Sequence, residues 1–152
     1  MVTDFARKGS WIFGIAACCT ATSANADYRL SRREEVIASV ECKVRDAGDL
    51  QSFLGINKDS IIKIETLSSY ESTISVDGEP YFTGFPAVLN FSRGNKQFSL
   101  SGEDQNDEGS RVSLQIQGPL NSKNDGVFIF GLTDSRVDAM GTGKLNHCRR
   151  TL

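Results

Sequence analysis

The sequence predicts a mainly β protein: a small antiparallel β-barrel or sandwich of seven to eight strands, with one or two short N-terminal helices and one disulfide. Three observations lead to this prediction. Short runs rich in β-branched and aromatic residues recur along the chain, with Gly-, Asn- and Asp-containing turns between them. The first residues have the pattern of an export leader. Two cysteines remain after that leader, one near each end of the predicted domain.

The leader has the three parts of a secretory signal peptide in the right order. A basic pair at 7–8 precedes the uncharged, largely apolar run 11–19, and the small residues of an A-x-A cleavage site follow at 24–26. The apolar run is too short to cross a bilayer, which takes about 20 apolar residues. We therefore expect a signal peptide over 1–26, a single β-rich domain over 27–152, and a periplasmic or secreted protein.

A second processing route is open. Residues 15–18, IAAC, resemble the bacterial lipobox, in which small residues precede a cysteine that becomes lipidated. In that case Cys18 would anchor the protein to a membrane surface of the envelope instead of leaving it free.

The two remaining cysteines, Cys42 and Cys148, are expected to pair. Two cysteines in an exported chain most simply form one disulfide. This bond would join the start of the domain to its end, and closing so long a loop is worth roughly 4–5 kcal/mol. A free thiol pair or a reactive cysteine is the alternative.

The first elements after the leader are expected to be short. Ser31 and Glu34 match a capping box and predict a helix over 31–38. The alternating stretch 40–44 predicts a strand. Asp49 is expected to cap a second helix that ends at Gly55.

The rest of the chain is expected to be strands and tight turns. Asp77-Gly78 is the strongest hairpin signal. The Gly-rich stretch near the C-terminus predicts a bulged or closely packed final strand. The stretches with strand-like composition after Gly55, from which with 40–44 we expect seven to eight strands in all, are 61–67, 73–76, 80–85, 87–92, 97–101, 111–117, 127–132 and 139–148.

The acidic stretch 102–110, GEDQNDEGS, resembles part of a calcium loop. Asp104, Asn106 and Glu108 fall at positions one, three and five of that template. Position twelve is Gln115, whose neutral amide cannot replace the bidentate carboxylate of the template. Because the flanking residues also alternate as strands do, we predict a hairpin loop and leave weak calcium binding as the alternative.

Composition and motifs exclude several kinds of site. The formal net charge is −2 and the charges are interspersed along the chain, so nucleic acid is not an expected partner. The single histidine, His147, is too few for most zinc sites, and no G-x-S-x-G motif is present. We predict no catalytic residue, no bound metal and no cofactor.

One aromatic segment is a candidate contact site. Tyr81, Phe82 and Phe85 place rings on both faces of a predicted strand, whereas a half-buried strand needs apolar groups on one face only. These residues are expected to line a ligand cavity or a partner surface. Burial of both faces is the alternative.

The function predicted from these features is an exported, non-catalytic binding module of the bacterial cell envelope or periplasm. Its partner would be a small ligand or an extracytoplasmic protein, and a membrane only if Cys18 is lipidated. Two alternatives remain: an envelope structural or interaction protein, and a hydrolase with carboxylates from separate strands. The placing of Cys42 in VECKV and Cys148 in KLNHC resembles the layout of periplasmic lysozyme inhibitors, which are small exported β-barrels. Their central Ser/Gly/Tyr loop has no counterpart, so no inhibitory residue is assigned.

Overall fold

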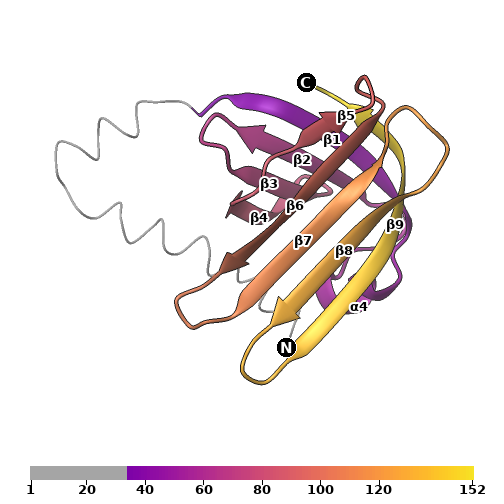
Figure 1. Cartoon of the computed structure of the whole chain (residues 1–152). Coiled ribbons are helices and arrows are strands. Elements are labelled where there is room, and N and C mark those ends of the chain that lie inside the picture. Colours follow the sequence, from indigo (N-terminus) through magenta and orange to yellow (C-terminus); the bar gives the residue numbers. More distant parts are fainter. Residues whose placement is uncertain (1–33) are drawn as a thin grey trace, which may run out of the picture.

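The computed structural model describes residues 34–152, which form one antiparallel sheet and one short helix (Figure 1). The sheet has nine strands, in the order β4-β3-β2-β1-β9-β8-β7-β6-β5. The last strand of the chain therefore lies between the first strand and β8. The elements are β1 Val36–Asp46, α4 Asp49–Leu54, β2 Ile61–Leu67, β3 Ser72–Val76, β4 Glu79–Phe85, β5 Asn90–Ser92, β6 Gln97–Gln105, β7 Arg111–Pro119, β8 Gly126–Thr133 and β9 Asp138–Arg150.

The sheet folds over so that its two halves face each other across one core. In Figure 1, β5–β9 lie in front of β2–β4. The ring centroids of Phe82 on β4 and Phe130 on β8 are 6.1 Å apart, although these strands are far apart in the sheet order. The inward positions of β7, Val112, Leu114 and Ile116, are all buried as their alternation predicts. Helix α4 closes one side of this core by packing against β9, where Gly141 and Gly143 leave room for it.

Most of the predicted strands are present, and the differences are local. Residues 34–152 contain nine strands, one more than the upper end of the prediction. The Asp77-Gly78 hairpin is confirmed, and both residues have the positive φ values (51° and 83°) of a type I′ turn. The segment 87–92 contributes only the three-residue strand β5, because its first residues cross from one half of the sheet to the other.

The two helix predictions had different outcomes. Helix α4 ends as predicted at Gly55, which has the left-handed conformation. The predicted cap is wrong, because Gly48 occupies the cap position and makes no side-chain hydrogen bond there. The predicted helix over 31–38 is also wrong where it can be compared: β1 begins at Val36 and pairs with both β2 and β9. Pairing on both sides outweighs the local helix signal. Residues 31–33 lie outside the described part.

Two bulges set which side chains enter the core. In β4, Gly84 has a φ of 63°, and two steps along β3 correspond to three along β4 at this point. As a result Phe82 and Phe85 both point inward although they are three residues apart. In β9, His147 has a φ of 49°, and it is the extra residue of a bulge opposite β1.

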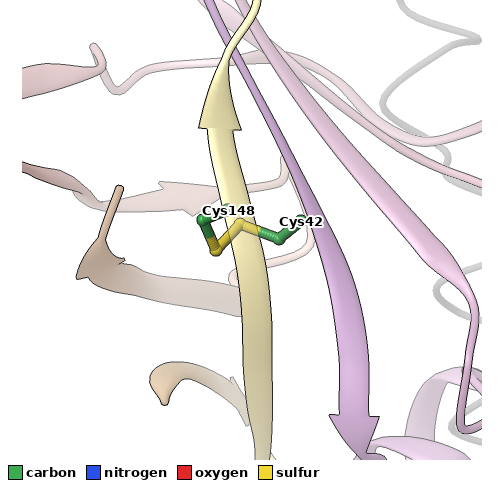
Figure 2. Close-up of a disulfide and its surroundings, with 2 residues drawn as sticks. All are labelled: Cys42 and Cys148. Carbon is green, nitrogen blue, oxygen red and sulfur yellow. A yellow bond between two sulfur atoms is a disulfide. The ribbon is translucent and has the colours of Figure 1, made fainter. Parts of the chain in front are cut away.

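The second bulge brings the two cysteines together. Cys42 on β1 and Cys148 on β9 are buried and form a disulfide across the two neighbouring strands (Figure 2). The bond joins positions 106 residues apart in sequence. The predicted pairing is therefore confirmed.

A small buried hydroxyl network holds the crossover between β4 and β5. Thr66 and Ser72 are fully buried, and their hydroxyl oxygens are 2.9 Å apart. The Ser72 hydroxyl donates to the carbonyl of Ala87 at 2.6 Å, and the Leu89 amide donates to the Thr66 hydroxyl at 3.0 Å. The crossover has no neighbouring strand to pair with, so these side-chain hydrogen bonds take the place of backbone bonds between strands.

Candidate functional site

The aromatic residues singled out from the sequence lie mostly in the core. Phe82 and Phe85 are 4% and 2% exposed, and their ring centroids are 6.3 Å apart. Tyr81 is half-buried and packs against the core from outside. The rings fill the space in which a small ligand would have to lie, and only Tyr81 is partly open to a partner. Their role as contacts stays a prediction.

The acidic stretch forms the hairpin between β6 and β7. The side-chain oxygen of Asn106 accepts hydrogen bonds from the amides of Glu108 at 3.1 Å and Ser110 at 2.9 Å. Asp104 accepts from the amide of Gln105 at 2.9 Å. The residues of the calcium hypothesis thus hold the turn itself, and within residues 34–152 no group of three or more His, Cys, Asp or Glu side chains is arranged to hold a metal ion.

Asp104 also differs from the other residues of this hairpin in its position. It follows Gly102 on the inward row of β6 and is partly buried. Burial, which disfavours the charged form, raises the pKa of its carboxyl, and a hydrogen bond from the Gln105 amide opposes this effect. One desolvated carboxyl is not the pair that acid–base hydrolysis needs.

Charges that are interspersed in sequence are separated in space. The β6–β7 hairpin and the β8–β9 loop lie side by side, because residues 105, 111, 133 and 138 are consecutive register partners. They form an acidic end, in the lower part of Figure 1, with Glu103, Asp104, Asp107, Glu108, Asp134 and Asp138 against Arg111 and Arg136.

At the other end, cations gather around the β7–β8 loop. The Leu120 amide donates to the carbonyl of Lys96 at 2.8 Å, and the Asn121 amide donates to the carbonyl of Cys148 at 2.7 Å. These bonds bring the β5–β6 turn, the β7–β8 loop and the last residues of β9 together. The cations brought together are Arg93, Lys96, Lys123, Arg149 and Arg150.

Two surface grooves flank this loop, and we call them the basic grooves. One has a volume of about 450 Å³ and contains Lys43, Lys123 and Arg149. The other has a volume of about 540 Å³ and contains Arg93 and Lys96. Asn121 and Ser122 line both, so the two grooves adjoin at this loop.

The cations of the basic grooves differ in how far they are already paired. Arg149 contacts Glu41 at 2.7 Å, and Lys43 contacts Asp59 at 3.2 Å. Arg93, Lys96 and Lys123 are exposed and form no ion pair within the described part of the chain. They are the groups that an anionic partner could neutralise without displacing an existing contact.

A further ion pair connects the β7–β8 loop to β1. Arg45 of β1 contacts Asp125 at 2.6 Å. The hydrogen bond from Arg45 holds the pKa of Asp125 below its usual value, with a smaller contribution from Lys144. The same contact raises the pKa of Arg45. The pair ties the end of the β7–β8 loop to β1.

No short sequence pattern marks this site. Its cations come from positions between 43 and 150, and the antiparallel register brings them to one end. The available clue was that several of them stand in or beside turn segments, which are exposed.

Comparisons with known proteins found no relative of this chain. No protein-family model, no curated protein and no solved structure matches this chain. Within the described residues there is no helix long and apolar enough to cross a membrane.

Proposed function

We propose that this protein is an exported, non-catalytic binding module whose basic grooves bind an acidic extracytoplasmic protein. The observation that carries the proposal is the concave surface around the β7–β8 loop, with Arg93, Lys96 and Lys123 free of ion pairs among residues 34–152. Complementary charge at such a surface favours both the encounter with a partner and the choice of partner.

One feature supports export, and another supports binding at the surface. A buried disulfide suits an oxidising compartment, in keeping with the leader pattern of the first residues, which lie outside the described part. The interior is packed with rings, so we favour surface binding over a small ligand held inside. On this view the folded-over sheet is a filled, incompletely closed barrel that serves as a rigid support for its loops.

Binding of poly-L-glutamate, measured by isothermal titration calorimetry at low salt, tests the proposal. Lys123→Glu is expected to weaken binding by about tenfold, because it turns an attraction into a repulsion within the groove. Arg136→Glu is the matched control: it changes the net charge equally but lies in the β8–β9 loop at the acidic end.

Two outcomes would contradict the proposal. If Arg136→Glu weakens binding as much as Lys123→Glu, only the net charge matters and the basic grooves are not a site. If the unmodified protein binds no acidic polypeptide even at low salt, an acidic partner is excluded. Mass spectrometry of the mature N-terminus in native material tests export, and it also separates cleavage after Ala26 from lipidation at Cys18.

The envelope interaction protein remains the second candidate. The observation that favours it is the uncharged row of Ser101, Gln115, Ile129 and Thr142 on the outside of β6–β9.

A further inference from the structure

The histidine of the β9 bulge lines one of the two basic grooves. His147 is exposed, and it borders the groove of about 450 Å³ together with cations from β1, β9 and the β7–β8 loop. Because β9 has one extra residue here, His147 lies on the outer surface while Cys148 faces the core. His147 forms no ion pair within the described part of the chain. The groove therefore contains one side chain whose charge depends on pH in the neutral range.

The other charges of this groove nearly cancel. Three cations line it, Lys43 on β1, Lys123 in the β7–β8 loop and Arg149 on β9, whereas β2 contributes only an isoleucine. Glu41 of β1 pairs with Arg149, and Asp59, which precedes β2, pairs with Lys43. Three cations against two carboxylates leave one positive charge in excess, at Lys123. Both carboxylates are already paired, so a new cation in the groove would not be neutralised by them.

We propose that protonation of His147 increases the affinity of this groove for a carboxylate-rich partner. A proton on the imidazole raises the excess in the groove from one positive charge to two. Carboxylates of the partner that contact both Lys123 and His147 are then held more tightly in weakly acid solution than in weakly alkaline solution. This inference rests on the proposed function, because it concerns the same groove and the same class of partner.

One added charge in an open groove has a modest effect. Two unit charges about 4 Å apart in water attract each other by about 1 kcal/mol, which corresponds to about a fivefold change in affinity. Salt screens exposed charges, so the effect of pH should shrink as the salt concentration rises. Linkage is reciprocal: a partner that prefers the protonated groove also favours proton binding at His147. Binding near neutral pH is therefore expected to be accompanied by proton uptake.

Calorimetric titration with poly-L-glutamate at low salt, at about pH 5.5 and about pH 8, tests the inference. His147→Asn and His147→Lys are a matched pair: asparagine is uncharged and tolerates the left-handed backbone, and lysine is charged at both pH values. From the higher to the lower pH, the parent should gain about fivefold in affinity relative to His147→Asn. His147→Lys should bind more tightly than His147→Asn by a similar factor at both pH values. Any change in the polymer itself affects all three proteins and cancels in these ratios.

Proton uptake is measured on the parent protein, without any substitution. Titrations near neutral pH in two buffers of different ionisation enthalpy report the number of protons bound with the polymer. Uptake is expected for the parent and should be smaller for His147→Asn. Binding by the parent with no proton uptake overturns the inference.

A displaced imidazole is the control for a general effect of charge. The double variant His147→Asn/Ser135→His keeps one histidine but places it in the β8–β9 loop, at the acidic end. It should show the same pH dependence as His147→Asn. If the double variant regains the parent's pH dependence, or if His147→Asn never loses it, the inference is overturned and the proposed function stands. If the parent binds no polymer at either pH, the proposed function and the inference both fail.

Discussion

Cys148 meets Cys42 because His147 is an extra residue in β9. If β9 contained the same residues but no bulge, strict alternation from the inward-facing Leu145 would place His147 inward and turn Cys148 outward. The bulge adds one residue, so Leu145 and Cys148 both face the core although they are three residues apart. The lone histidine thus has a structural place, and its left-handed backbone is part of that bulge.

Inserting one alanine between His147 and Cys148 is expected to prevent the disulfide. With the bulge kept at His147, the added alanine takes the inward position and the cysteine turns to the outer face, away from Cys42. Titration of the folded variant with a thiol reagent should then find the two cysteines free. His147→Gly is the control: it keeps the bulge and relieves the left-handed backbone, so the disulfide should form as usual. Disulfide formation in the insertion variant would contradict this account.

Removing the disulfide is expected to lower the free energy of unfolding by about 4 kcal/mol. The bond closes a loop with a sequence separation of 106, and in the chain-entropy model a loop of this length constrains the unfolded chain by that amount. Urea unfolding of Cys42→Ala/Cys148→Ala against the parent protein measures the difference. Full stability after loss of both cysteines would mean that β1 and β9 are held by their ladder and core contacts alone.

The local parts of this fold could be predicted from the sequence, and the long-range parts could not. The Asp77-Gly78 hairpin, the helix end at Gly55 and the inward row of β7 each depend on a few adjacent residues. The disulfide was also predictable, because the two cysteines that follow the predicted leader have one simple pairing. The placing of β9 beside β1 depends on contacts between distant residues, which no short pattern encodes.

The crossover between β4 and β5 should depend on the Ser72 hydroxyl. Ser72→Ala leaves the buried Ala87 carbonyl without its donor and Thr66 without its partner, so we expect a loss of about 2 kcal/mol in unfolding free energy. Ser75→Ala on the same strand, where the side chain faces outward, should change stability by less than about 0.5 kcal/mol. Equal effects would show that the buried network is not what holds the crossover.

Asn106 is expected to stabilise the hairpin without calcium. Its side chain accepts two amide hydrogen bonds within the turn. Asn106→Ala should therefore cost about 1 kcal/mol in urea unfolding, as for other side-chain caps of backbone amides. Calorimetric titration of the parent protein with calcium chloride should give no heat at millimolar ion. Heat of binding that disappears in Asn106→Ala would favour the calcium loop instead.

The candidate site was harder to predict than the fold, for a physical reason. Short sequence patterns relate only neighbouring residues. They indicate Tyr81, Phe82 and Phe85 as contacts because rings stand on both faces of one predicted strand. The bulge at Gly84 explains that pattern, since it turns the rings of Phe82 and Phe85 into the core. The cations Lys96 and Lys123 are far apart in sequence, and their loops are brought together by the pairing of β6 with β7 and by the hydrogen bond from the Leu120 amide to the Lys96 carbonyl.

The ion pair between Arg45 and Asp125 should contribute to stability in a pH-dependent way. Arg45 holds the pKa of Asp125 below its ordinary value of 3.8, so the folded chain binds that proton less readily than the unfolded chain. The stabilisation is therefore fully present above the unfolded pKa and is lost as the pH falls through the lower, folded pKa. Urea midpoints measured from neutral to strongly acid pH should separate the parent from Asp125→Asn at neutral pH and converge in acid. Arg45→Gln should give the same dependence, and the double variant should lose no more than either single variant. A difference between parent and Asp125→Asn that persists unchanged in strong acid would show that the asparagine acts by some means other than charge.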